Sequence, residues 1–190
     1  TASAIAQTMM QGVSTDTVYV ASGESFPDAL AGAALAGSNG QPVLLTSPKS
    51  LPAATAQRIS TLGPDRIVVL GGSAAVSSAV VSRLEDYTTG KVTRLAGADR
   101  FATAAAVAKK FGTGVRAAYV ASGLDFPDAL AGAALAGSQD SPVLLTGKTS
   151  VPAPTRTALT ALAPGRVVVL GGTGVVSTAT AGALGAFANP

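Results

Sequence analysis

Two residue types with versatile side chains are missing from this chain of 190 residues, and each absence removes a class of chemistry. There is no cysteine, so a disulfide, a thiol nucleophile and a cysteine-ligated metal are all excluded. There is no histidine either, which removes the commonest general base and metal ligand and makes a Ser–His–Asp triad impossible. Aromatic residues make up only 4% of the chain, without tryptophan, which leaves few rings for stacking nucleic acid bases.

Charge is also scarce. Charged residues make up 12% of the chain, against about 25% in average proteins, and the 13 lysines and arginines form no basic run. The net charge of +3 fits an anionic partner without requiring one, and we expect no nucleic acid partner. The longest run of small apolar residues, Ala29–Gly37, is far shorter than the roughly 20 residues that span a bilayer. We therefore expect a folded protein that does not span a membrane, of a composition often found in secreted proteins.

What the chain has is an internal repeat. Residues Tyr19–Ser38 recur at Tyr119–Ser138 with 18 of 20 positions identical, at an offset of 100 residues. The same offset relates Pro42–Thr46 to Pro142–Thr146. Repetition at a fixed period indicates tandem copies of one structural unit, and we divide the chain into a first module over residues 1–90 and a second over residues 91–190.

Strand-forming and helix-forming segments alternate in each copy. Apolar runs at Thr17–Ser22, Pro42–Thr46 and Arg66–Leu70 are separated by helical segments, which is typical of a parallel sheet with crossover helices. We expect an α/β fold with two tandem repeats, each a small three-layer sandwich of about four parallel strands, in an order that the sequence leaves open. A further run, Lys91–Leu95, is interpreted as the strand that opens the second module. No equivalent precedes Thr1, so the first module is expected to lack its N-terminal strand, as in a piece of a longer array.

The helix expected from Pro27 onwards consists almost entirely of alanine, leucine and glycine. Small residues allow a helix to approach a sheet or another helix closely, and we favour this packing role over a binding role. Asp28 and Asp128 follow the prolines that start these helices, where a carboxylate suits the helix dipole. Asp125 could pair with Asp128, but the first copy has Ser25 at that position.

Motifs for catalysis and cofactors are incomplete. Gly147-Lys148-Thr149 resembles the end of a phosphate-binding loop, but the first glycine of that motif is replaced by Pro142. Gly172-Thr173-Gly174 resembles a dinucleotide fingerprint, yet Ser177 stands in place of its last glycine. We therefore expect no catalytic residue, no metal and no cofactor.

The remaining candidate is the edge of the sheet where strands end and helices begin. Open backbone amides at such an edge favour anions, and here the edge would carry Ser22-Gly23, Gly71-Gly72-Ser73 and Gly97-x-Asp99-Arg100. These groups suit sugar hydroxyls and phosphate or uronate groups. The alternative is that the glycines are present only because tight turns need them, and composition does not decide between the two.

Four motifs in fixed order give a resemblance to a known family. They stand at Arg94–Thr103, Tyr119–Leu130, Pro142–Thr146 and Val167–Gly172, with first-copy matches at Tyr19–Leu30, Pro42–Thr46 and Ile67–Gly72. The chain resembles the cell-wall-binding repeat 2 modules of Gram-positive surface proteins. The resemblance implies a non-catalytic anchor of Toprim-like fold that holds a secreted protein at the cell surface by binding an anionic wall polymer, such as a teichoic acid or a secondary wall polysaccharide.

The resemblance also implies which residues contact the polymer. It points to the Pro-x-Leu-Leu-Thr segments, with basic residues nearby, although we expect the leucines to lie in the core and the threonines that follow them to be exposed. With the glycines of the sheet edge, the candidate ligand-binding residues are Thr46, Lys49, Arg100, Thr146, Lys148, Gly71, Gly72, Gly171 and Gly172.

Family modules usually occur in threes around a pseudo-threefold axis, and this chain has two copies. A third module or a second copy of the chain is therefore an expected partner for the alanine-rich faces. An alternative function follows from the same faces, namely a protein–protein assembly or adhesion module of the cell surface.

Overall fold

Parallel strands form two separate sheets in the computed structural model, which describes residues 1–10, 15–125 and 127–189. The first sheet has the order β2-β1-β3-β4 and the second the order β6-β5-β7. The strands are β1 (Thr17–Ser22), β2 (Val43–Thr46), β3 (Arg66–Leu70), β4 (Lys91–Leu95), β5 (Ala118–Ser122), β6 (Val143–Thr146) and β7 (Val167–Leu170). The α/β class and the parallel pairing are as predicted.

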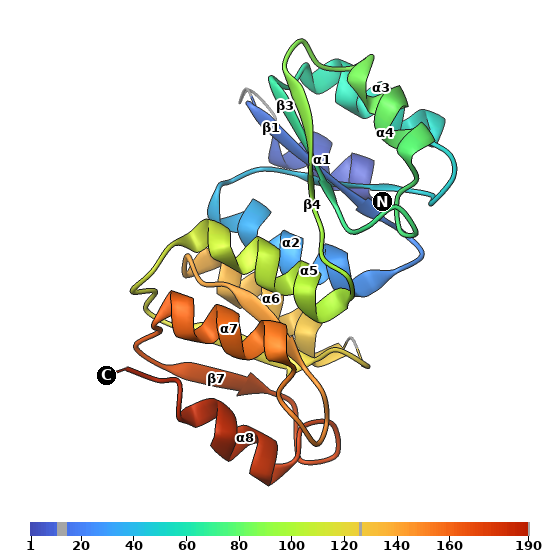
Figure 1. Cartoon of the computed structure of the whole chain (residues 1–190). Helices are drawn as coiled ribbons and strands as arrows, with labels where there is room; N and C mark the ends of the chain where they lie inside the picture. Colours follow the sequence, from blue (N-terminus) through green and yellow to red (C-terminus); the bar gives the residue numbers. More distant parts are fainter. Residues whose placement is uncertain (11–14, 126, 190) are drawn as a thin grey trace.

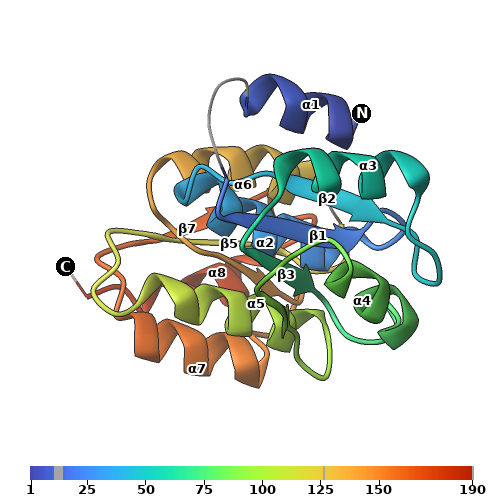
Figure 2. The same ribbon diagram turned by 90° about the horizontal axis from the view of Figure 1, so that it is seen from above.

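Helices lie on both faces of the sheets (Figures 1 and 2). They are α1 (Ala2–Met9), α2 (Phe26–Ser38), α3 (Ala53–Leu62), α4 (Ser78–Glu85), α5 (Arg100–Ala108), the 3-10 helix η1 (Lys109–Phe111), α6 (Pro127–Ser138), α7 (Ala153–Leu162) and α8 (Thr178–Gly185). Their ends follow local chemistry: the Asp99 carboxylate accepts a hydrogen bond from the Ala102 amide at the start of α5, and Gly63 ends α3 in the left-handed conformation.

Strand β4, which the sequence analysis interprets as the strand that opens the second module, belongs to the first sheet. It pairs with β3 in register, Arg66 opposite Lys91 and Leu70 opposite Leu95, and so completes the first sheet. A division after residue 90 therefore cuts this sheet, and the boundary between the two modules stays a prediction. The physical reason is that a β–α–β crossover through α4 returns the chain to the sheet it has just left.

The core of each half lies on both faces of its sheet. On one face of the first sheet, Val18, Val20 and Ile67 are fully buried under α3 and α4. On the other face, Tyr19 and Leu70 pack towards α2. Burial on both faces explains why the strands are continuously apolar instead of alternating.

Small residues bring the two halves together at α2 and α6, which lie between the sheets (Figure 1). A Cβ atom added to Gly37 would lie 3.5 Å from the Cα atom of Gly137. Helix α5 packs beside α2 and also covers β6 and α7, so it joins the first half to the second. The expectation that the helix from Pro27 packs tightly is confirmed for α2. Its partners include α6, which is the same helix in the other copy.

Candidate functional site

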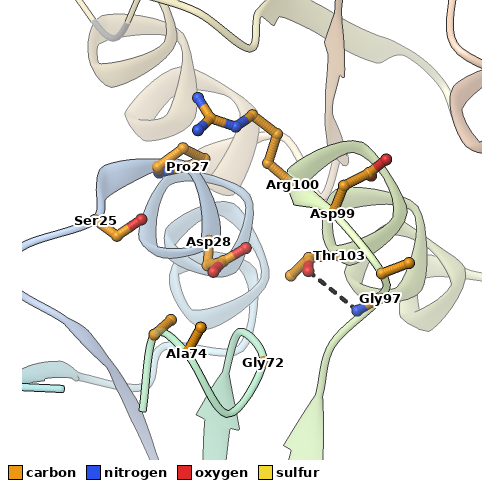
Figure 3. Close-up of a pocket in the computed structure, with 11 residues that line it drawn as sticks. Ser25, Pro27, Asp28, Gly72, Ala74, Gly97, Asp99, Arg100 and Thr103 are labelled. Carbon is orange, nitrogen blue, oxygen red and sulfur yellow. Dashed lines mark hydrogen bonds between the residues drawn. The ribbon is translucent and has the colours of Figure 1, made fainter. Parts of the chain in front are cut away.

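A cavity of about 280 Å³ opens where the two halves meet at the carboxyl edge of the first sheet (Figure 3). Three segments line it: the start of α2, the loop after β3 and the turn between β4 and α5. Its polar lining residues are Ser25, Asp28, Asp99, Arg100 and Thr103. The first residues of α2 and α5 both border this cavity, and exposed backbone amides at helix starts give the site a positive electrostatic bias.

Asp28 is the buried carboxyl group of this site, with 9% of its surface exposed. Burial raises the pKa of the Asp28 carboxyl, while a hydrogen bond from Thr103 and the charge of Arg100 act in the opposite direction. The Thr103 hydroxyl in turn accepts a hydrogen bond of 3.1 Å from the Gly97 amide, drawn as a dashed line in Figure 3. This network connects the start of α2 with the first turn of α5.

Arg100 reaches from α5 to the turn after β5, where its Nη1 donates a hydrogen bond of 2.6 Å to the Gly123 carbonyl. Its side chain lies at the mouth of the cavity beside Pro27 (Figure 3). Of the predicted site residues, Arg100 and Gly72 are the two that the structure brings into this cavity.

The paired glycines at the strand ends have different roles. Gly71 and Gly171 have positive φ angles of 97° and 105°, and a Cβ atom there would approach the Oδ2 atom of Asp28 or Asp128 to 2.3 or 2.5 Å. Conformation and space therefore require glycine at both positions. A Cβ atom on Gly72 or on its counterpart in the second copy would meet no atom within 4 Å.

The threonines at the strand ends are not exposed, so that prediction is wrong. Thr46 is 2% exposed and Thr146 is fully buried. Each hydroxyl donates a hydrogen bond to a backbone carbonyl four residues later, Ser50 at 2.9 Å and Ser150 at 3.3 Å. The hydroxyl thus closes the loop after its strand, which accounts for threonine at this position.

The two leucines before each threonine are mostly core residues, as expected. Leu44, Leu144 and Leu145 are buried, but Leu45 is 39% exposed. The lysines expected nearby, Lys49 and Lys148, are exposed in the loops after β2 and β6 and do not line the cavity.

Sequence reasoning missed Asp28 and Thr103 as members of this site. Asp28 was explained by its place in the first turn of a helix, which is correct as far as it goes. Its second role depends on α5 packing beside α2, a contact between segments about 70 residues apart that one sequence does not reveal. Among the described residues, no group of three acidic side chains could hold a metal ion, and no helix is long and apolar enough to cross a bilayer.

Comparison with known proteins connects this architecture with the bacterial cell wall. The chain is 36% identical over 137 residues to the amidase enhancer of Bacillus subtilis, covering 72% of this chain and 19% of the relative. It is 32% identical over 161 residues to the N-acetylmuramoyl-L-alanine amidase LytC of the same organism, covering 85% of this chain and 32% of the relative. The chain thus spans a third or less of these curated relatives.

A solved structure shares the fold. Cwp6 from Clostridium difficile superimposes with a TM-score of 0.89 at 26% identity, over 98% of this chain and 30% of that chain. Residues 1–81 and 94–181 match the profile of the family described as cell wall binding domain 2. The chain therefore belongs to the cell wall binding domain 2 family and is a cell-wall-binding module located at the cell wall or cell surface.

Proposed function

We propose that this module anchors its protein by holding an anionic wall polymer non-covalently, and that the module itself is not an enzyme. The observation that carries the proposal is the cavity beside Arg100, which two helix starts and a guanidinium border. A phosphate or carboxylate of a polymer would accept hydrogen bonds there from Arg100 and from backbone amides near Gly72.

The two carboxyl groups in the cavity are compatible with an anion. The Asp99 carboxylate already accepts a hydrogen bond from the Ala102 amide, at 2.8 Å. Burial raises the pKa of Asp28, so an incoming negative charge would favour its protonated form further. The exposed Lys49 and Lys148 and the edge glycines Gly171 and Gly172 remain proposed contacts on the same edges of the two sheets. Weak sites on linked repeats gain avidity when they meet a repeating polymer.

A cosedimentation assay tests this proposal. The chain is mixed with purified Gram-positive walls, before and after acid extraction of the polymers, over a series of salt concentrations. We expect binding that falls with salt and disappears after extraction. Arg100→Gln is expected to weaken binding about tenfold or more, since a hydrogen bond to a charged group contributes about 1.5–3 kcal/mol.

Arg83→Gln removes one positive charge from the exposed surface of α4 and is the matched control. Retention of the chain on extracted walls would contradict an anionic polymer as ligand. An equal loss in the Arg83 variant would show that net charge, and not this cavity, determines binding.

A second candidate function is association with another module or with a second copy of this chain. It is favoured by apolar side chains exposed on both copies: Ile5, Met9 and Leu45 in the first and Leu124, Leu130 and Leu135 in the second. At the internal boundary, the positions corresponding to Leu130 and Leu135 are buried against α5. The second copy therefore exposes on α6 the two leucines whose equivalents on α2 are covered by α5.

Light scattering of the purified chain over a range of concentrations tests this second candidate. Association is expected to be lost in a Leu130→Glu, Leu135→Glu double variant, because two charges would be buried without partners. A chain that stays monomeric at the highest concentration would contradict self-association. Binding of a separately produced third repeat would then be the remaining form of this candidate.

A further inference from the structure

A second cavity, of about 460 Å³, lies at the other end of α2. It is bordered by the exposed part of the β3 and β4 face, the last residues of α2 and the 3-10 helix η1. Its polar lining includes Thr17, Tyr19, Asn39, Arg66, Thr93 and Lys110. Like the first cavity, it lies where residues of both copies meet, but its cations Arg66 and Lys110 belong to none of the sequence motifs.

Positive charge gathers at this cavity. Arg66 at the start of β3 and Lys110 in η1 line it, and Lys91 stands opposite Arg66 in the sheet register. Side chains of paired residues in neighbouring strands leave the same face of a sheet, so Lys91 projects to the same side as Arg66. Asp16 and Asp65 directly precede the lining residues Thr17 and Arg66 in the sequence, but neither carboxylate lines the cavity.

These cations are available to a ligand. Within the described ranges, the side chains of Arg66, Lys91 and Lys110 make no hydrogen bond or ion pair. Arg94 also borders the cavity, but its guanidinium donates to the carbonyls of Gly71 and Val76 at 2.5 and 2.8 Å and is already satisfied. Neighbouring like charges without a counter-charge repel one another, and a bound anion would remove that cost.

Hydroxyl groups complement the charges. The Asn39 amide donates a hydrogen bond of 3.4 Å to the Tyr19 hydroxyl, which leaves the tyrosine proton free to be donated to a ligand. The exposed Thr93 side chain adds a second hydroxyl on β4. A lysine near a helix end is often explained by the helix dipole, but that explanation does not extend to Arg66 at the start of a strand.

We propose that this cavity is a second anion-binding site, for a phosphate or carboxylate carried on a hydroxylated chain, with Arg66 and Lys110 contacting the charge and Tyr19 and Thr93 the hydroxyls. The two cavities lie at opposite ends of the α2–α5 contact, so one polymer chain running along the boundary would meet both. The inference rests on the proposed function only in taking the natural ligand to be a wall polymer.

NMR titration of the isotope-labelled chain tests this site with three probes: glycerol 1-phosphate, glucuronate and neutral glycerol. We expect saturable shifts at the Thr93 and Lys110 amides and the Asn39 side-chain amide with at least one of the anions, and none with glycerol. Response to only one anion would identify the charged group as phosphate or carboxylate. An Arg66→Gln, Lys110→Gln double variant is expected to raise the dissociation constant about tenfold or more.

Two further variants make the test decisive. The single variant Lys110→Gln changes an exposed side chain and must weaken binding in a chain whose spectrum is otherwise unchanged. Arg83→Gln must leave the titration as it is. Absence of shifts at this cavity with both anions, or equal weakening by the Arg83 variant, would overturn the site.

Arg100→Gln separates this inference from the proposed function. The titration is expected to be unaffected in that variant, whereas wall binding is expected to fall. An intact titration in a chain that does not bind walls would refute the proposed function alone. Wall binding that persists without any titration would refute the second site alone.

Discussion

Helices α2 and α6 share the twelve residues PDALAGAALAGS, yet their surroundings differ. Leu30 and Leu35 in α2 are 6% and 5% exposed, whereas Leu130 and Leu135 in α6 are 58% and 47% exposed. Helix α6 packs on α2 with one face, and α2 packs in addition against α5. Since the sequences are identical, the difference comes from the surroundings of the helices, above all from α5, which belongs to the following repeat.

The polar residues at the helix starts repeat this contrast. Asp28 is buried beside Thr103 and Arg100, while its equivalent Asp128 is exposed. The β4–α5 segment thus buries both the leucines and the carboxyl group of the helix it covers. The cavity that we propose to bind polymer forms where this segment is present, so the proposed function places binding at the junction between repeats.

The largest expected effect is the loss of stability when a leucine that is buried in α2 but exposed in α6 is shortened. Leu30→Ala is expected to lower the free energy of unfolding by about 2–5 kcal/mol, because it leaves a cavity between α2 and α5. Leu130→Ala, the same change on the exposed helix, is expected to stay within about 0.5 kcal/mol. Urea denaturation of both variants measures the difference, and equal losses would show that α6 is covered in solution.

A second change separates the two helices. A Cβ atom on Gly137 would lie 3.2 Å from the Ala34 carbonyl oxygen, so the further methyl groups in Gly137→Val must push α2 and α6 apart. We expect a cost of about 1–3 kcal/mol. Gly182→Val in α8 is the control, because a Cβ atom there meets nothing within 4 Å. A destabilised control would point to strain within a helix as the cause.

A third change concerns the loop after β3, residues 72–76, and its counterpart after β7, residues 172–176. Arg94 holds the carbonyls of Gly71 and Val76, and Arg94→Gln is expected to lower the local opening free energy of this loop by about 1–2 kcal/mol. Hydrogen exchange of residues 72–76 should rise towards that of residues 172–176. Unchanged exchange would mean that β4 holds the loop without the guanidinium.

The smallest expected effect is on pH dependence. Because burial raises the pKa of Asp28 above its ordinary value of 3.8, its neutral form is favoured in the folded protein. The stability it contributes is complete below the unfolded pKa and is lost as pH rises through the folded pKa. Asp28→Asn should remove this pH-dependent component from unfolding curves measured between pH 3 and pH 7. Asp128→Asn is the control on the exposed copy.

The sequence was sufficient for the elements but not for their partners. Proline and aspartate at helix starts, apolar strand runs and the period of 100 residues predicted α2, α6 and both parallel sheets. They did not predict that β4 joins the first sheet, because Lys91–Leu95 has the same local pattern whichever sheet it pairs with. The burial of Thr46 depends on a loop that turns back on its hydroxyl.

The candidate site was predictable only in part, because local patterns identify single residues but not which residues come together. Arg100 and Gly72 belong to motifs that mark the carboxyl edge, and the structure places both at one cavity. Arg66 and Lys110 belong to no motif and lie in different copies, so only the folded chain brings them to the second cavity. Local patterns therefore predicted single positions, and contacts between copies decided which positions share a site.

The direct passage from β4 into α5 has a consequence for how such arrays change during evolution. Only residues 96–99 separate a strand of the first sheet from a helix that packs on the other half. A gene rearrangement that inserts or deletes a whole period of 100 residues preserves this strand–helix connection wherever the crossover falls, since every period carries one copy of each. Arrays can therefore lengthen or shorten without redesign, and each added repeat brings with it a junction at which a new cavity forms.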